Sequence, residues 1–157
     1  MTSDGAAARA IRRAGAADLA AYVLLVNDYI DQTGWLARAK SRDVVAAMFV
    51  PDLLQERVVL LAVMARQITG YLSVPATGRV GARCPAAALR GHRIGKRLLH
   101  ALKALHRDGL TLTTHEPNDG ARRCYARQGL LEVPGRRCDA TDKGVPALLL
   151  RWPGGAA

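Results

Sequence analysis

Two glycines and a run of basic side chains open one leucine-rich segment of the chain, "LRGHRIGKRLLHAL" at residues 89–102. Apolar residues recur at helical spacing from Ile94 onward, so the cations fall at the start of a predicted helix. A helix start carries about half a positive charge and several unpaired N–H groups. Further cations are useful there when an anionic ligand lies against them, and glycine lets backbone N–H groups approach that ligand. We therefore predict an anion-binding loop at this point.

The loop does not match the common nucleotide-binding motifs. A Walker A loop places four residues between its glycines and follows the second glycine with Lys and then Ser or Thr. Here three residues separate Gly91 from Gly95, and Lys96 is followed by Arg97. The G-x-G-x-x-G pattern of dinucleotide-binding folds is also missing. A nucleoside triphosphate site or a dinucleotide site is therefore not expected.

A second group of chemically interesting residues lies further along, in "NDGARRCYARQGL" at residues 118–130. Asn118 is well placed to cap a short predicted helix, and Gly129 is well placed to end it. Tyr125 falls within that helix. Each residue also has a purely structural interpretation, because Asn118 could serve only as a cap and Tyr125 could simply pack in the core.

Taken together, the two segments resemble the GNAT acyltransferases. That family has a [QR]-x-x-G-x-[GA] loop, which Arg90 to Gly95 resembles, and a later N-x-x-A-x-x-x-Y-x-x-x-G motif. The second motif is matched at four positions: Asn118, Ala121, Tyr125 and Gly129. The opening "AIRRAGAADLAAY" and the closing "TDKGVPALLLRW" are similar to family members too, so the resemblance covers nearly the whole chain. It points to a small, single-domain bacterial member.

The resemblance implies an acetyl-CoA-dependent N-acetyltransferase that acts on a small-molecule or peptide amine. In such enzymes the amine attacks the thioester directly, and positioning of the cofactor supplies most of the rate. Tyr125 would be the general acid toward the departing thiolate. Asn118 would contact the pantetheine arm or order the end of the strand. The cofactor's pyrophosphate would be held by Arg90, Gly91, His92, Arg93, Ile94, Gly95 and Lys96.

The chain departs from the family pattern at two points. Arg93 replaces the central glycine of the loop, which costs roughly 1–2 kcal/mol if the backbone there is left-handed, although a cation beside a pyrophosphate can compensate. The strand before the loop lacks the glutamate that often serves as general base. Our first candidate for the base is Glu116, our second is His115, and a chain of waters is the third option.

The charge distribution leaves two other functions open. Of the net charge of +10, most lies in residues 76–130, which hold eleven Lys or Arg against three Asp or Glu. A nucleic-acid-binding domain is the less favoured explanation, because stacking aromatic residues and a helix-turn-helix pattern are both missing. The other alternative is a degenerate member of the fold that binds acyl-CoA or a partner without catalysis.

The cysteines and the apolar runs indicate a cytoplasmic protein without metal or membrane segments. Cys84, Cys124 and Cys138 are three cysteines at unrelated spacings, which suits a reducing compartment. The sequence contains neither a C-x-x-C pair nor an H-E-x-x-H motif, so a metal site is not expected. The longest apolar run, Val58 to Ala65, fits a buried strand and is far shorter than the ~18 residues of a membrane span. Cys124 is interpreted as small core filler rather than as a nucleophile.

The periodicity of the chain predicts a mixed α/β fold in one domain, residues 1–157. We expect one mostly antiparallel central sheet of about six to seven strands, flanked by about four helices. The predicted order is β-α-α-β-β-β-α-β-α-β-β, with a hairpin turn at "RQ", residues 66–67. The predicted second helix begins at Ser41 and stops around Pro51, and Pro85 is expected at a strand edge, bulge or end.

The end of the first predicted helix is a candidate acceptor region. In this fold the acceptor pocket usually lies between the first two helices and the later strands. Asp28, Asp31 and Trp35 fall there, and two carboxylates beside an aromatic ring would suit a cationic amine. The alternative is that the two carboxylates simply form the solvated face of a helix end. The sequence leaves the acceptor unidentified and the formation of a homodimer open.

Overall fold

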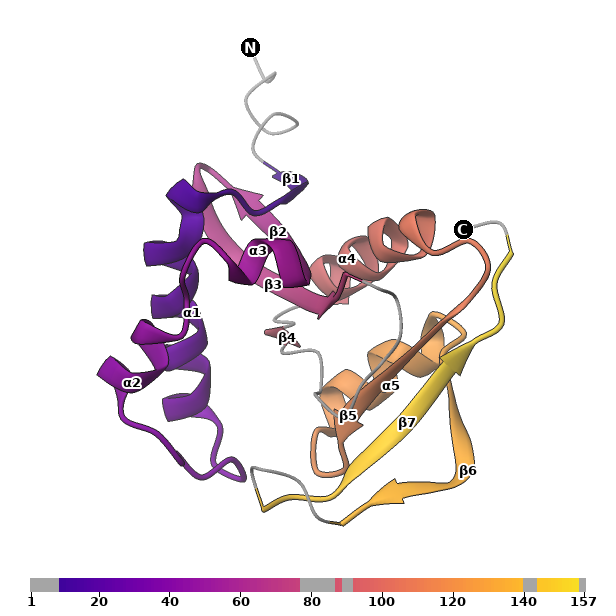
Figure 1. Ribbon diagram of the computed structural model, residues 1–157. Coiled ribbons are helices and arrows are strands. Elements are labelled where there is room, and N and C mark those ends of the chain that lie inside the picture. The colour runs from indigo at the N-terminus through magenta and orange to yellow at the C-terminus, as the bar shows by residue number, and fades with distance from the viewer. Residues whose placement is uncertain (1–8, 77–86, 89–91, 140–143, 156–157) are drawn as a thin grey trace.

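The structure is a computed structural model that describes residues 9–76, 87–88, 92–139 and 144–155 (Figure 1). The expected mixed α/β fold with antiparallel strands is confirmed. A short 3-10 helix (η1) and a short third helix (α3) are additions to the predicted order. The elements are β1 (Arg9–Arg13), η1 (Ala16–Asp18), α1 (Leu19–Gln32), α2 (Arg42–Ala47), α3 (Leu53–Glu56), β2 (Arg57–Met64), β3 (Gln67–Pro75), β4 (Ala87–Ala88), α4 (His92–Leu105), β5 (Leu110–His115), α5 (Asp119–Arg127), β6 (Leu131–Cys138) and β7 (Ala147–Trp152).

Among the residues that the structure describes, the strands form two sheets where we expected one. A four-stranded sheet has the order β1-β2-β3-β4, and a three-stranded sheet has the order β5-β7-β6. All pairings are antiparallel. The described part of β4 pairs Ala87 with Leu72 and Ala88 with Tyr71. Pro85, which we expected at a strand end, lies outside the described residues.

The predicted hairpin between β2 and β3 is confirmed. Met64 pairs with Gln67, so the turn consists of Ala65 and Arg66. Both have a positive φ, 50° and 66° respectively, which is the conformation of a two-residue hairpin turn that follows the twist of its strands. Neither residue is a glycine, asparagine or aspartate, the residue types that usually mark such a turn in a sequence.

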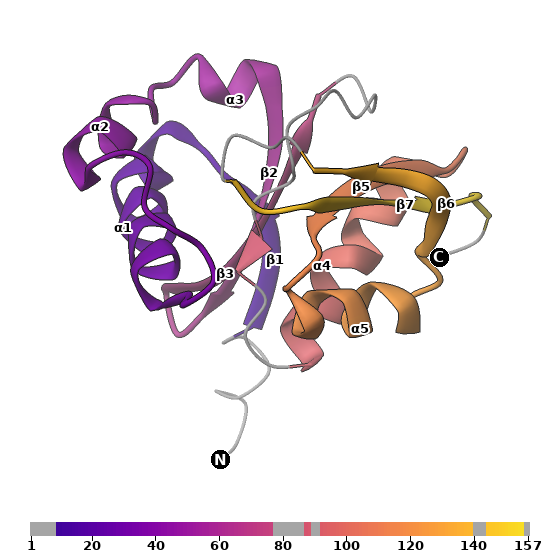
Figure 2. The ribbon, with the colours of Figure 1, turned by 90° about the horizontal axis from the view of Figure 1, so that it is seen from below.

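Helix α4 lies against both sheets and joins them. Its inward residues Leu98, Leu99 and Leu102 are buried in one hydrophobic cluster with residues of β2, β3, β5, β7 and α5. Figures 1 and 2 show α4 and α5 side by side on the same face of the β5-β7-β6 sheet. The outward face of α4 carries exposed cations, among them Lys96 and Arg97.

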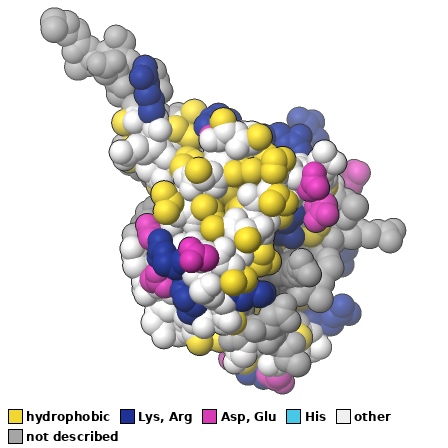
Figure 3. Space-filling model, turned by 60° about the vertical axis from the view of Figure 1, so that its left-hand side comes forward, with side chains coloured by type: hydrophobic (Ala, Val, Ile, Leu, Met, Phe, Trp, Pro, Cys, Tyr) yellow, Lys and Arg dark blue, Asp and Glu magenta, His cyan; other side chains and the backbone are white. Residues whose placement is uncertain are grey.

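Helix α1 covers the other face of the first sheet. Its Tyr22, Val26 and Ile30 are buried with Val59 and Leu61 of β2 in a second cluster. Strand β2 therefore has apolar residues on both faces, which explains why it reads as a continuous apolar run. Figure 3 shows hydrophobic side chains also gathered on the outer surface of this side, where the exposed apolar residues include Leu24, Val44, Met48 and Val50.

The predicted second helix is interrupted. Ser41 does cap α2, because its Oγ accepts a hydrogen bond from the Val44 N–H at 3.2 Å. The helix ends at Ala47, however, and a separate turn of helix begins at Leu53. The helix is therefore shorter than predicted: Pro51 disfavours helical backbone at Val50, but α2 ends three residues before that position.

Strand β6 forms one edge of the second sheet. Its pairing with β7 shifts between Glu132 and Arg137, and Gly135 in that interval has a φ of 73°. Nearly all of its residues are exposed. The strand therefore contributes little to the core.

Candidate functional site

The predicted anion-binding loop leads directly into α4, whose first residue is His92. Arg90 and Gly91 lie outside the described residues, and of His92 and Arg93 only the helical backbone is described. Three further predicted cofactor-binding residues follow in the helix: Ile94 packs against the core, Gly95 is buried and Lys96 is exposed.

The start of α4 has the chemistry of an anion site. The helix has no acidic residue in its first turn. Unpaired N–H groups at a helix start and the positive end of its dipole favour a phosphate group, and the exposed Lys96 adds a full charge. The Ile94 side chain belongs to the core, so only its backbone could serve a ligand.

Asn118 links the junction of β5 and α5 to the first helix. Its Oδ1 accepts a hydrogen bond from the Ala121 N–H at 3.2 Å, which caps α5 as the sequence predicted. Its Nδ2 donates to the Tyr29 hydroxyl oxygen of α1 at 3.3 Å. The two residues are 89 positions apart in the chain. Asn118 is therefore a cap and also a contact between the two halves of the fold.

Tyr125 lies in the middle of α5 and is buried, with 1% of its surface exposed. It packs in the cluster that α4 shares with both sheets. Burial raises the pKa of Tyr71 well above its usual value, and the charges of Tyr22, Tyr29 and Tyr125 raise that pKa further. The Tyr71 ring packs edge-on against the Tyr22 ring of α1, with the ring centroids 5.0 Å apart, and Tyr29 and Tyr125 lie near enough to act on Tyr71 electrostatically.

Sequence reasoning missed Tyr29 and Tyr71 as members of this group. Tyr29 lies on α1 and Tyr71 on β3, and each fits the apolar pattern of its element. Their meeting with Asn118 and Tyr125 depends on how α1 packs against the first sheet. Local spacing carried no signal for it.

Glu116, the first candidate for the general base, is held by a cation of β6. Its carboxylate accepts a hydrogen bond from Nε of Arg137, whose guanidinium also pairs with Asp139. The backbone of Glu116 is fixed as well, because its N–H donates to the Pro146 carbonyl at 2.8 Å. A proton acceptor in this position would have to compete with an ion pair.

His115, the second candidate, ends β5 and contacts the segment that follows α1. Its ring centroid lies 5.5 Å from that of Trp35, with the two ring planes tilted by 53°. Trp35 was one of three residues expected to face an acceptor. The structure thus brings the segment after α1 against the same junction that holds Asn118.

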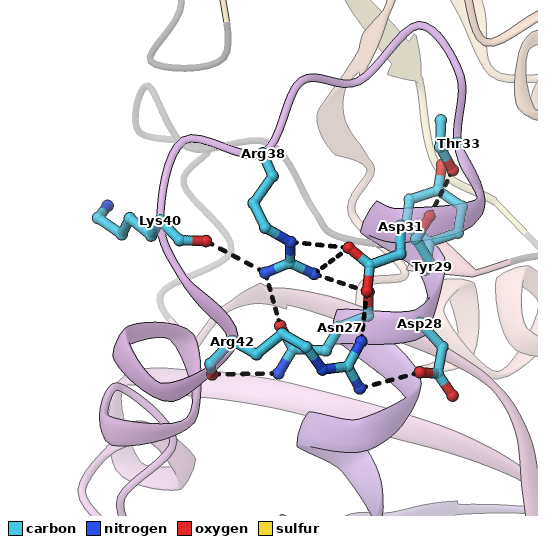
Figure 4. Close-up of polar contacts among 8 residues, drawn as sticks. All are labelled: Asn27, Asp28, Tyr29, Asp31, Thr33, Arg38, Lys40 and Arg42. Atoms are coloured by element: carbon cyan, nitrogen blue, oxygen red, sulfur yellow. Dashed lines mark hydrogen bonds and ion pairs between the residues drawn. The ribbon is translucent and has the colours of Figure 1, made fainter.

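The two acidic residues of the predicted acceptor region are bound to cations of the chain (Figure 4). Asp28 pairs with Arg42 at 3.0 Å, and Asp31 pairs with both Arg38 and Arg42. Hydrogen bonds from Arg38 and Arg42 lower the pKa of Asp31 below its usual value. Both carboxylates are exposed at the end of α1, which favours the solvated-face interpretation.

The remaining ionisable candidates are consistent with structural roles. Cys124 is partly buried and packs against the core, and burial raises the pKa of its thiol, which makes a reactive thiolate less accessible. Over the described ranges, no three His, Cys, Asp or Glu side chains are grouped as metal ligands would be. No helix within those ranges is long and apolar enough to cross a membrane.

Residues 67–130, less than half of the chain, match the model of the Acetyltransferase (GNAT) family. The matched segment contains Asn118, Tyr125 and the start of α4. None of the curated proteins matches the chain at a significant level.

Solved structures show the same fold over nearly the whole chain. Salmonella typhimurium yncA, solved with its cofactor acetyl-CoA, is 20% identical with a TM-score of 0.67, covering 93% of this chain and 94% of that one. The ribosomal-protein-alanine N-acetyltransferase of Brucella melitensis is 22% identical with a TM-score of 0.66, covering 92% and 99%. RimL, a ribosomal L7/L12 alpha-N-protein acetyltransferase solved with coenzyme A, is 12% identical with a TM-score of 0.70, covering 96% of each chain.

Proposed function

We propose that this protein is an acetyl-CoA-dependent N-acetyltransferase, because residues 67–130 match the model of the GNAT acetyltransferase family and the chain has the fold of solved acetyltransferases. Its acceptor is the primary amine of a small molecule or a peptide. The amine attacks the thioester directly, without a covalent enzyme intermediate. Residues 1–157 act as a single acetyltransferase domain.

The hydrogen bond between Asn118 and Tyr29 is the observation that carries the proposal. It joins the GNAT motif on α5 to α1, on the side where a GNAT enzyme receives its acceptor. The same asparagine fixes the start of the helix that carries Tyr125. Residues that only packed in the core would not require a side chain that is hydrogen-bonded to both α1 and α5.

The residues present fit the cofactor. The pyrophosphate is assigned to the loop and helix start from Arg90 to Lys96, where backbone N–H groups and cations are available and acids are missing. Asn118 is assigned to the pantetheine arm, because its amide can donate and accept. When bound, acetyl-CoA supplies the activated thioester. Solved structures of the same fold contain acetyl-CoA or coenzyme A, which supports this assignment.

Tyr125 is proposed to donate its hydroxyl proton to the leaving sulfur. A phenol carries no charge while it is protonated, so it can be buried in the core until it acts. Its surroundings exclude water, since it has 1% of its surface exposed. Glu116 is proposed as the proton acceptor for the amine, directly or through a water. Its ion pair with Arg137 would then have to open or rearrange during turnover.

Calorimetric titration with acetyl-CoA at moderate salt tests the cofactor site. We expect micromolar binding that the Arg90→Ala, Gly95→Ala double variant loses. Turnover is then followed as release of free thiol with a panel of amines: putrescine, phenethylamine, methionine and a peptide with N-terminal alanine. Tyr125→Phe should lower kcat by about a hundredfold or more while leaving acetyl-CoA affinity unchanged.

Cys124→Ala is the matched control, because Cys124 lies next to Tyr125 on α5 and is assigned no chemical role. It should keep the turnover of the natural sequence. Absence of acetyl-CoA binding, or binding without turnover of any amine, would contradict the proposal and indicate a member of the fold that has lost catalysis.

A further inference from the structure

The segment between α1 and α2, residues 33–41, is tied to α1 along its length although it is neither helix nor strand (Figure 4). At its start, the Thr33 hydroxyl donates to the Tyr29 carbonyl oxygen at 2.6 Å. In its middle, the Leu36 N–H donates to the Thr33 carbonyl oxygen at 3.0 Å, and the Leu36 side chain is buried. At its end, Ser41 caps α2. The segment is therefore held in one conformation.

Arg38 makes most of the contacts that hold this segment. Its Nε and Nη2 atoms lie 2.8 Å and 2.7 Å from Oδ1 of Asp31. Nη1 donates to the Asn27 Oδ1 at 2.9 Å and to the Lys40 carbonyl oxygen at 3.1 Å. Nη2 also donates to the Asn27 carbonyl oxygen at 2.9 Å. A guanidinium has five N–H donors, and these five contacts are enough to use all of them.

The partners of Arg38 are themselves fixed. Asn27 has only 3% of its surface exposed, and its Nδ2 donates to the Arg42 carbonyl oxygen at 3.3 Å. The Arg38 side chain has 23% of its surface exposed, whereas the Arg42 side chain has 44%. Arg38 thus connects the carbonyl of Lys40, near the end of the segment, to the buried side of α1. Arg42 adds only exposed ion pairs to Asp28 and Asp31.

Trp35 belongs to the same segment. It lies three residues before Arg38, and its ring contacts that of His115 at the end of β5. His115 in turn precedes Asn118 by three residues, and the Asn118 N–H donates to the His115 carbonyl oxygen at 3.0 Å. The Trp35–His115 pair therefore borders the place where the proposed function puts the acceptor amine.

The charges around this pair do not favour an acceptor that carries a second cationic group besides its reacting amine. Asp28, Asp31 and Glu116 are each ion-paired with an arginine of the chain. An acceptor cation would have to displace one of those arginines. Trp35 and His115, both partly exposed, offer ring surfaces against which a planar group can stack.

We propose that Arg38 is a positioning residue that holds Trp35 against His115, and that this ring pair selects acceptor amines carrying an aromatic group. The acceptor preference rests on the proposed acetyltransferase function. The holding of Trp35 by Arg38 does not, so the two parts are tested by separate measurements.

Tryptophan fluorescence tests whether Arg38 holds the ring. The chain has two tryptophans, so a Trp152→Phe background reports Trp35 alone. In that background Arg38→Ala should shift the emission to longer wavelength and raise the acrylamide quenching constant about twofold, because the ring moves into water. Arg42→Ala is the matched control and should change neither. Arg38→Lys keeps the charge but has only three donors on one nitrogen, so it should behave like Arg38→Ala.

The ratio of kcat/KM for phenethylamine to that for putrescine tests the acceptor class. A ratio does not depend on how much of a variant is folded. We expect a ratio of about ten or more, falling towards one in both Trp35→Leu and Arg38→Ala and unchanged in Arg42→Ala; a tenfold ratio corresponds to about 1.4 kcal/mol. A preference for putrescine, or a ratio that Arg38→Ala leaves unchanged, would overturn the acceptor assignment.

The two measurements separate the two ways of failing. If neither amine is acetylated although acetyl-CoA binds, the acceptor assignment falls while fluorescence still decides the role of Arg38. If emission and quenching of Trp35 are the same in the natural sequence and in both folded Arg38 variants, the positioning role is wrong whatever the enzyme acetylates.

Discussion

Replacing Asn118 by alanine removes two hydrogen bonds that hold different parts of the fold. The cap on α5, from the Ala121 N–H to Oδ1, is worth about 1 kcal/mol. The bond from Nδ2 to the Tyr29 hydroxyl contributes about another 1 kcal/mol. Together they predict that Asn118→Ala lowers the free energy of unfolding by about 2 kcal/mol. For a chain of 157 residues this corresponds to a fall in Tm of about 4–8 °C.

Two matched variants divide that loss. Asn118→Asp keeps an oxygen for the Ala121 N–H and places a negative charge at the start of α5, which the helix dipole favours. It loses only the donor to Tyr29, so it should cost less than about 1 kcal/mol. Tyr29→Phe removes the same bond from the other side and should cost a similar amount. In the Asn118→Asp background, Tyr29→Phe should then have little further effect.

Urea unfolding followed by circular dichroism measures these differences, with unchanged m-values showing that the comparison is valid. Equal destabilisation by Asn118→Ala and Asn118→Asp would show that the cap does not stabilise α5. Full additivity of Asn118→Asp and Tyr29→Phe would show that the two side chains do not interact in solution. Either outcome would refute the reasoning that makes Asn118 a link between α5 and α1.

Two further predictions concern the ends of the chain. The bond from Arg12 lowers the pKa of Asp18 to about 2, so the contribution of Asp18 to stability is complete above its ordinary pKa and is lost as the pH falls through about 2. The difference in urea midpoint between the natural sequence and Asp18→Asn should therefore be large at pH 5 and small at pH 2. A difference that stays the same at both pH values would contradict this. At Gly154, where φ is 97°, an added Cβ would lie 2.7 Å from the Arg107 carbonyl oxygen, so Gly154→Ala should cost about 3 kcal/mol. Gly135→Ala is the control: Gly135 has a φ of 73° and open space around it, so this variant should lower the free energy of unfolding by only about 1 kcal/mol. Equal losses of unfolding free energy in the two variants would show that the backbone around residue 154 shifts to accommodate the Cβ.

The sequence predicted those parts of the fold whose signals are local. The spacing of the leucines predicted α4. Asn118 predicted the start of α5, and in the structure its side chain does cap that helix. The continuous apolar run of β2 gave a strand buried on both faces. Ser41 gave the start of α2, but the helix ends at Ala47 and not around Pro51 as predicted, because the apolar residues before Pro51 fit a helical pattern without continuing the helix.

The candidate site was predicted only in part, because its geometry is not local. The spacing of Asn118 and Tyr125 identified the motif, yet nothing near them in sequence indicated Tyr29 as the partner of Asn118. Asp28 and Asp31 suggested a cation site because their arginine partners, Arg38 and Arg42, lie seven to fourteen residues away in a different element or segment. Which carboxylates are free to meet a ligand depends on how α1, the following segment and α2 are packed.

The edge strand β6 limits how copies of this protein can associate. An exposed strand edge is a template for pairing with another chain, and such pairing leads to aggregation or to sheets shared between subunits. Pro134 has no N–H to donate, Gly135 has a positive φ within an interval where the pairing register shifts, and the exposed Arg136 would face its own copy in an antiparallel pair. The edge that β6 presents is therefore unfavourable for pairing with an identical strand from a second copy.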